Sequence, residues 1–158
     1  MGPVSTAASA AVVLCVFVAV LEGVCAGKNI RAFFQTVRVP RYSAPLWVWS
    51  IIGAAYYAVF GFIAFRLLSA VPPSFLARAT LTLLVAMMVA NALTNLIIFR
   101  ARNLPLSYAI GCAFVVLDIT LMVCLLRLDE FAASVLIPYL VYRVYAVWWG
   151  RALAKLNP

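Results

Sequence analysis

The stretch PRYSAPLWVWSIIGAAYY, residues Pro40–Tyr57, joins a basic, proline-broken loop to an apolar helix. Pro40 and Pro45 have no backbone N–H donor, and they hold the residues before them away from helical angles. Residues 41–44 are therefore predicted to be extended or turning, and a helix is expected to begin near Leu46. The pattern indicates a loop that enters a long apolar element, and the rest of the chain is interpreted outward from this junction.

Trp47 and Trp49 fall in the first turn of that helix, where an indole ring suits a membrane–water boundary or the roof of a pocket between helices. Both interpretations require a membrane. Of the 158 residues, 68% are hydrophobic and 10% are charged, with a mean hydropathy of +1.13, whereas a soluble domain is typically about half apolar. The composition predicts a multi-span membrane protein.

Apolar runs of about 20 residues, long enough to cross a membrane, divide the chain. We expect residues 1–158 to form one all-α domain, an integral membrane bundle of five transmembrane helices with a lid-like loop over 27–45. The first run ends in small residues, as a cleavable signal does. It lacks a basic start and exceeds a usual signal core, so we expect it to be retained. The predicted spans are 5–26, 46–68, 76–99, 105–126 and 131–153.

Lysines and arginines lie unevenly on the two sides of this layout, and cytoplasmic loops carry the excess of such residues. We therefore expect the amino terminus outside or in a lumen and the carboxyl terminus in the cytoplasm. The charges flank spans and form no continuous stripe, so we expect anionic headgroups of the lipid bilayer as partner and no nucleic acid. One side holds Lys28, Arg31, Arg38, Arg41, Arg100, Arg102, Arg151 and Lys155, and the other holds Arg66, Arg78 and Arg127.

Side chains that carry most metal and nucleophile chemistry are missing or confined to apolar runs. Histidine is absent, which removes imidazole metal sites, histidine haem ligation and Ser-His or Cys-His nucleophile pairs. The four cysteines all lie inside predicted spans, never as C-x-x-C, and are interpreted as small packing residues. We expect no catalytic residue, no metal site and no cofactor.

Span four contains Asp118 and span five contains Arg143, both deep in the hydrocarbon. An unpaired charge at that depth costs at least about 2.5–3.5 kcal/mol on insertion scales. Counted from the intervening turn, antiparallel helices place the two residues about 6 Å apart in depth, within reach of an arginine side chain. We predict a structural ion pair, with a substrate-binding guanidinium as the alternative.

Two further polar positions lie within spans. Glu22, one turn from the end of span one, is expected to reach the interface or to pair with Lys28 or Arg31, with a ligand or proton role as the alternative. Asn91 lies on the polar face of span three, where an amide must find a partner because lipid offers none. Hydrogen bonding between helices explains Asn91, and contact with a ligand is the alternative.

Aromatic residues gather on three segments. The loop over 27–44 carries three of them beside four basic residues, and it is interpreted as a lid or binding loop or as a segment that lies on headgroups. Spans two and five each carry an aromatic stripe at helical spacing, which favours helix packing and leaves a pocket wall as the alternative. The stripes are Trp49, Tyr56, Tyr57 and Phe60 in span two, and Tyr142, Tyr145 and Trp149 in span five.

With these features in place, the chain resembles the TspO/MBR family of translocator proteins and tryptophan-rich sensory proteins, the peripheral benzodiazepine receptor family. The likeness covers roughly residues 33–157, and the kept spacing of its motifs makes it specific. The matched positions are Pro40, Tyr42, Pro45, Trp47, Tyr57, Gly61, Asn91, Phe99, Ala132, Ala133, Leu136, Pro138, Tyr139, Leu140 and Asn157.

The chain also departs from the family pattern. In the loop, Tyr42 replaces a Trp and Ala44 replaces a Pro. Gly53 in span two and Thr94 in span three each replace a tryptophan. Near the end of span five, Gly150 replaces an Asn and Arg151 replaces an aromatic residue.

The resemblance implies a homodimeric membrane receptor or transporter, with a transport or sensory role, in a bacterial envelope membrane or an organelle membrane of the mitochondrial outer type. Its pocket between the helices, lidded by the first loop, would bind tetrapyrroles such as porphyrin or haem, sterols, or benzodiazepine- and isoquinoline-type ligands. Arg41 is a candidate for a porphyrin propionate. The expected lining residues are Trp47, Trp49, Tyr57, Asn91, Tyr139, Tyr142 and Trp149.

Two other functions stay open. Light-dependent porphyrin breakdown, an enzymatic activity within the same family, is not expected because Gly53 and Arg151 replace two aromatic positions. The second is a structural or assembly membrane protein without a pocket, in which Asn91 contributes to stability alone.

Overall fold

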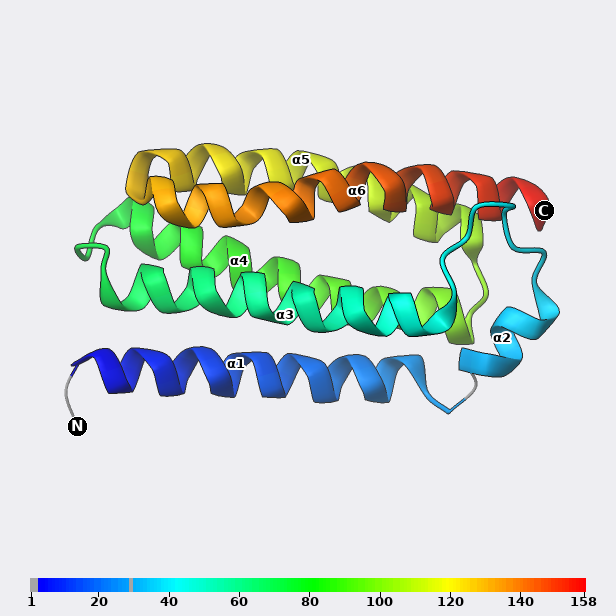
Figure 1. The fold of residues 1–158 in the computed structure, drawn as a ribbon, viewed down its shortest axis with the longest axis horizontal. Coiled ribbons are helices and arrows are strands. Elements are labelled where there is room, and N and C mark those ends of the chain that lie inside the picture. The colour runs from blue at the N-terminus through cyan, green and yellow to red at the C-terminus, as the bar shows by residue number, and fades with distance from the viewer. Residues whose placement is uncertain (1–2, 29) are drawn as a thin grey trace.

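A computed structural model describes residues 3–28 and 30–158, which form helices and short connections without strands. The all-α class is thereby confirmed, and five of these helices are long and apolar enough to cross a membrane. The elements of Figure 1 are α1 (Pro3–Ala26), α2 (Ile30–Thr36), α3 (Leu46–Ser69), α4 (Phe75–Asn95), the π-helical turn η1 (Leu96–Arg100), α5 (Leu104–Leu128) and α6 (Glu130–Leu156).

Two details differ from the expectation. The segment 27–45, expected to be a loop, contains the short helix α2, whose Phe33 is buried against the bundle. The third span widens into η1 after Asn95, whose side-chain amide donates to the carbonyl oxygens of Asn91 and Ala92 at 3.2 Å. Side chains that bond back to their own helix compete with the regular ladder, and single π-helical turns are often found at functional sites.

The five long helices close into a ring. Helix α1 packs on α3 and α4, α6 packs on α3 and α5, and α4 packs on α5. Figure 1 shows α1, α3 and α6 side by side, with the short α2 at the end where α6 finishes. The interior is apolar, and its largest fully buried side chains include Phe60, Ile63, Leu84, Met87, Met88, Leu121, Leu125 and Leu136.

Asp129 alone separates α5 from α6 and holds this turn in two ways. Its Oδ1 accepts hydrogen bonds from the N–H groups of Phe131 and Ala132 at 3.1 Å, which caps α6. Its Oδ2 accepts a 2.7 Å bond from Nε of Arg66 near the end of α3. The Arg66 hydrogen bond, and with it the two capping amides, lowers the pKa of this carboxyl from its ordinary value.

Gly61 lets α3 approach α1 closely, as small residues do between membrane helices. A Cβ atom at this position would lie 2.7 Å from Sγ of Cys15, which is closer than such atoms come in proteins. The Cys15 thiol in turn donates to the carbonyl oxygen of Tyr57 at 3.6 Å. Gly53, two turns earlier in α3, has open space where its Cβ would be.

These two glycines make a matched pair of substitutions. We expect Gly61→Ala to lower the free energy of unfolding by about 1–2 kcal/mol, because Cys15 Sγ must move and lose its hydrogen bond. Gly53→Ala should be neutral or stabilise by up to about 1 kcal/mol, because alanine favours the helix and finds room. Thermal unfolding in detergent measures both. Adding Cys15→Ala to Gly61→Ala should recover the part of the loss that comes from the steric clash, and no recovery would contradict this contact as its cause.

Asp129→Asn keeps a capping oxygen and removes the charge that Arg66 meets. We expect it to lower stability by up to about 1 kcal/mol at neutral pH, because the partly exposed Arg66 makes the pair a weak one. Since the folded-state pKa of Asp129 lies below its ordinary value, the pair stabilises fully above about pH 4 and is lost as the pH falls through the lowered pKa.

The difference in unfolding temperature between Asp129→Asn and the parent should therefore shrink on acidification. Glu130→Gln, at the exposed neighbouring position, should leave the pH profile of the parent unchanged. A difference that stays constant as the pH falls would show that the charge of Asp129 contributes nothing.

Candidate functional site

Aromatic side chains from α2, η1, α3 and α6 touch one another in an unbroken series, which we call the aromatic ladder. Neighbouring ring centroids lie 4.4 to 6.4 Å apart, the range of offset and edge-to-face pairs. The ladder begins in α2 and ends in the middle of the bundle. In order, its members are Phe33, Phe99, Phe34, Trp149, Trp49, Tyr142, Tyr139, Phe60 and Tyr56.

Trp49 and Trp149 form the centre of the ladder, with ring centroids 4.9 Å apart and planes inclined by 57°. Helix α3 begins directly after Pro45, as the proline pattern predicts, and Trp49 lies in its first turn. Tyr142 lies two helical turns before Trp149, on the same face of α6, and its ring stands edge-on to Trp49 at 6.4 Å. The structure thus brings four predicted lining residues, with Tyr139 as the fourth, into one series.

The connection between α2 and α3 is fastened to α6 by side chains of the same aromatic stripe. The Tyr145 hydroxyl donates to the Tyr42 carbonyl oxygen and accepts from the Ala44 N–H, both at 3.0 Å. The Trp149 indole N–H donates to Ser43 Oγ at 2.9 Å. The connection therefore crosses α6 near its carboxyl end, as Figure 1 shows.

Two further contacts hold the same connection. The Trp49 indole N–H donates to the Ala44 carbonyl oxygen at 3.0 Å, so the ladder itself supports the loop. The Asn157 side chain accepts from the Arg38 N–H at 2.8 Å and donates to the Arg38 carbonyl oxygen at 3.0 Å. Hydrogen bonds at both ends thus keep the connection on the bundle, in the position of a lid over Trp49 and Trp149.

The structure brings Asp118 and Arg143 together between α5 and α6. Arg143 Nε donates to Asp118 Oδ2 at 2.7 Å, and Arg143 Nη2 donates to the Tyr139 hydroxyl. Asp118 is 1% exposed and Arg143 is 9% exposed. The rings of Phe114 and Tyr139 lie 4.9 and 5.1 Å from the guanidinium carbon, close enough for cation–π attraction. The inner end of the ladder therefore adjoins a buried ion pair.

Two buried polar atoms at this inner end, Asp118 Oδ1 and the Tyr56 hydroxyl, have no hydrogen-bond partner among the described residues. A buried polar group without a partner costs about 1–3 kcal/mol. The Tyr56 ring lies 5.7 Å from Tyr139, which contacts Arg143. Both atoms thus belong to the group around Tyr139 and can offer hydrogen bonds to a polar group that enters there.

Of the two positions expected for Glu22, the pairing with Lys28 or Arg31 is not found in the described part of the chain. The Glu22 carboxylate accepts a hydrogen bond from the hydroxyl of Tyr57 on α3, and neither ion pair of the described residues includes it. Position 22 lies one helical turn after the fully buried Val18, so its side chain starts from the bundle-facing side of α1. Tyr57, a predicted lining residue, is thereby directed toward α1.

Trp47 and Arg41 also lie apart from the ladder. Trp47 is 66% exposed because it stands about 200° around α3 from Trp49, on the outward side of the helix. Arg41 is exposed on the connection, with its guanidinium 5.6 Å from the ring centroid of Tyr42. Both residues therefore stand at the rim of the site.

Asn91 lies on the side of α4 that carries the buried Met87 and Met88, and it is partly buried. Its side chain makes no hydrogen bond to another residue in the described part of the chain. The interhelical hydrogen bond expected for Asn91 is therefore not found there, and its amide remains open to a partner.

Sequence reasoning did not assign Phe34, Ser43 and Tyr145 to the site. Tyr145 lies three residues after Tyr142 and four before Trp149, so helical spacing was an available signal. Phe34 and Ser43 lie in a segment without a periodic pattern, and their position over α6 depends on the path of the chain.

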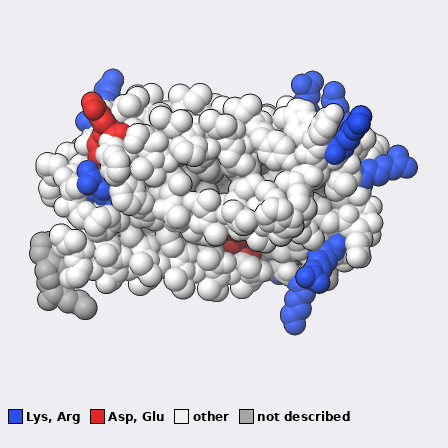
Figure 2. Space-filling model, in the orientation of Figure 1, with Lys and Arg blue, Asp and Glu red and all other residues white. Residues whose placement is uncertain are grey.

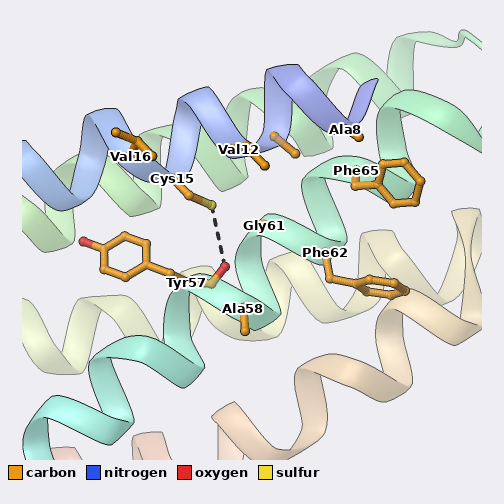
Figure 3. Close-up of a pocket in the computed structure, with 10 residues that line it drawn as sticks. Ala8, Val12, Cys15, Val16, Tyr57, Ala58, Gly61, Phe62 and Phe65 are labelled. Carbon is orange, nitrogen blue, oxygen red and sulfur yellow. Dashed lines mark hydrogen bonds between the residues drawn. The ribbon is translucent and has the colours of Figure 1, made fainter. Parts of the chain in front are cut away.

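A groove of about 510 Å³ lies between α1 and α3. Figure 3 shows its apolar walls from both helices and the hydrogen bond between the Cys15 thiol and the Tyr57 carbonyl oxygen. A smaller hollow of about 260 Å³ lies beside Trp148 and Arg151 near the end of α6. Neither is lined by the tryptophans of the ladder, whose rings contact one another.

Charges separate along the long axis of the molecule. Figure 2 shows basic groups gathered at the end where α6 finishes, whereas the opposite end carries both signs. The acidic residues of that opposite end are Asp129 and Glu130, at the junction of α5 and α6. The net charge of +8 is therefore concentrated at the lid end.

Comparison with known proteins identifies one family. A family model described as the TspO/MBR family matches residues 11–150 of the chain. No curated protein sequence matches it. The matched range includes every member of the aromatic ladder, the buried ion pair and Glu22.

Breaking the buried ion pair should be costly. We expect Asp118→Leu alone, or Arg143→Met alone, to lower the free energy of unfolding by about 3–5 kcal/mol, because each leaves an uncompensated buried charge. The double variant should recover most of this loss, since well-packed apolar side chains can replace a buried pair. Thermal unfolding in detergent measures the cycle, with the exposed Arg78→Gln as control. Strictly additive losses would show that the two residues do not act together.

Proposed function

The chain belongs to the TspO/MBR family, and from this premise we propose that it is a membrane receptor or transporter for flat, largely apolar ligands. Tetrapyrroles such as porphyrin or haem are the ligand class that we favour, with sterols and benzodiazepine- or isoquinoline-type molecules as further candidates. We also propose that it acts as a homodimer, as the family likeness implies. Its carboxyl terminus would face the cytoplasm, because the basic residues gather at that end.

The aromatic ladder is the observation that supports this proposal. A conjugated macrocycle presents the same apolar faces as the rings that stack on Trp49 and Trp149, and each aromatic pair contributes about 0.5–1.5 kcal/mol beyond burial of its area. A ligand that enters here would meet Tyr142 and Tyr139 further in, on the same face of α6. The ladder thus offers a series of aromatic rings that an apolar, conjugated ligand can contact.

Entry requires the rings and the lid to move, because the ladder is closed by ring contacts. The connection above Trp49 and Trp149 is held by hydrogen bonds from Tyr145 and Asn157, and each such bond contributes only about 0.5–1.5 kcal/mol net. Stacking on a ligand can offset the loss of several of them. We therefore propose that the segment between α2 and α3 lifts to admit the ligand, as lids do in other binding sites.

Polar groups at the two ends of the ladder would orient the ligand. At the rim, the exposed Arg41 suits a propionate, because guanidinium groups bind carboxylates in a bidentate manner. In the interior, the Asn91 amide and the unpartnered Tyr56 hydroxyl and Asp118 Oδ1 can hydrogen bond a ring substituent. Trp47 faces outward, away from the ladder, so we assign it no contact with the bound ligand.

Tryptophan fluorescence tests the proposal, because the ladder contains two of the four tryptophans. Protoporphyrin IX should quench the detergent-solubilised protein saturably at roughly micromolar concentration. Trp49→Phe and Trp149→Phe should each weaken binding by about three- to tenfold, since the smaller phenyl ring presents less aromatic surface to the ligand. Trp47→Phe is the matched control and should leave affinity unchanged.

Quenching without saturation, or equal losses in Trp47→Phe and Trp149→Phe, would contradict a site at the ladder. A protein that only stabilises an assembly would show no saturable quenching. We assign no enzymatic activity to the chain. Loss of porphyrin absorbance under illumination, with native and not with denatured protein, would require the light-dependent reaction instead.

A further inference from the structure

The groove between α1 and α3 is separate from the tryptophans of the ladder and opens on the outer surface of the bundle. Its volume is about 510 Å³. Val12 and Val16 at its rim are 62% and 57% exposed, so in a membrane it faces lipid. Cys15 and Gly61 line it, at the point where a Cβ atom on Gly61 would collide with Cys15 Sγ. Figure 3 shows that the labelled residues come from these two helices.

Glu22 lies at one end of this groove. It follows Cys15 by seven residues and therefore starts from the same face of α1. The ring of Tyr57 lines the groove, and its hydroxyl donates to the Glu22 carboxylate. The apolar channel between the helices thus leads to a carboxylate within the membrane span Val4–Ala26.

Glu22 differs from the other acidic residues in its charge balance. Asp118 is paired with Arg143, and Asp129 with Arg66, each at 2.7 Å. Glu130 is exposed at the start of α6. Within the described part of the chain, Glu22 meets a neutral hydroxyl and no cation.

A carboxylate at membrane depth is costly unless a positive partner accompanies it. The Tyr57 hydroxyl satisfies one acceptor site of Glu22 and leaves its negative charge uncompensated. A cation from outside the bundle would compensate this charge, and the groove, which is open to lipid, reaches Glu22 past the ring of Tyr57.

We propose that this groove binds a hydrophobic amine, with its protonated nitrogen on the Glu22 carboxylate and a single long apolar chain between α1 and α3. Along α1, the distance from Glu22 to Ala8, at the far end of the groove lining, is about 21 Å, which suits an extended alkyl chain. Glu22 lies about 6 Å inside the end of α1, so the charged head would rest just beneath the interface.

The chemistry of the site selects an amine over other amphiphiles of the same shape. A fatty acid would place its carboxylate beside that of Glu22, and two negative charges so close together repel each other. A fatty alcohol can donate a hydrogen bond to the carboxylate and cannot neutralise it. An ammonium group supplies both the donors and the opposite charge.

The test uses three probes with one chain: hexadecylamine, hexadecanol and hexadecanoate. Native mass spectrometry from detergent micelles counts bound molecules and gives affinities. Hexadecylamine should bind saturably, and hexadecanol and hexadecanoate should bind at least about tenfold more weakly. Glu22→Gln should weaken amine binding about tenfold or more and should abolish the preference over the alcohol. Glu130→Gln, an exposed acid at the other end, should change nothing.

Ala58→Phe gives a second variant that leaves Glu22 intact. Ala58 is exposed in the groove wall, so a phenyl ring there should fill the channel and block the amine and the alcohol alike. Protoporphyrin quenching should be unaffected by either variant, which separates this site from the ladder.

Three outcomes would overturn the proposal. The first is equal affinity for amine and alcohol in the parent protein. The second is unchanged amine binding in a folded Glu22→Gln variant. The third is a dimer that dissociates on Ala58→Phe, since a second copy of the chain would then occupy the groove.

Discussion

The hydrocarbon interior of a membrane supplies no hydrogen-bond partners, and the arrangement of polar side chains in this bundle follows from that constraint. Arg143 reaches Asp118 and Tyr139, and Glu22 reaches Tyr57, so polar groups at depth meet one another between helices. These contacts tie α5 to α6 and α1 to α3. Apolar packing distinguishes neighbours poorly in lipid, because lipid tails are as apolar as the side chains. We infer that these few polar contacts specify the depth and rotation of the helices, while small residues such as Gly61 set how closely they approach.

Helix α6 connects the separate features of the site. One stripe of its surface supplies a partner of the buried ion pair, the middle of the aromatic ladder and the bonds that hold the lid. Because helical neighbours three and four residues apart are fixed relative to one another, a shift of one ring constrains the next. If the segment between α2 and α3 moves as we propose, the tryptophan pair beneath it, and through Tyr142 and Tyr139 the interior, would respond. The members of the stripe are Tyr139, Tyr142, Tyr145 and Trp149.

Much of this architecture could be predicted, because hydropathy and helix rise act along the chain. The spans follow from apolar length, the start of α3 from Pro45, and the approach of Asp118 to Arg143 from equal depth on antiparallel helices. The partner of Glu22 could not be foreseen. Span one is apolar on all sides, so its sequence gives no preferred face toward the bundle. The outward position of Trp47 depends likewise on the rotation of a helix about its axis, which the sequence does not give. The short helix α2 depends on the burial of Phe33 against the rest of the bundle.

The two candidate sites differ in how a ligand would reach them, and this follows from their packing. In the ladder the rings are in contact, so a ligand must replace aromatic contacts and lid hydrogen bonds before it adds its own. The affinity of the ligand is then the difference between the contacts it makes and the ring contacts and hydrogen bonds it replaces. Its association rate would be limited by the opening of the segment between α2 and α3. The groove between α1 and α3 is already open to lipid, and an occupant would add contacts without displacing any ring of the ladder. Access to the first site should therefore be gated by the segment between α2 and α3, whereas access to the second depends on partition into the membrane alone.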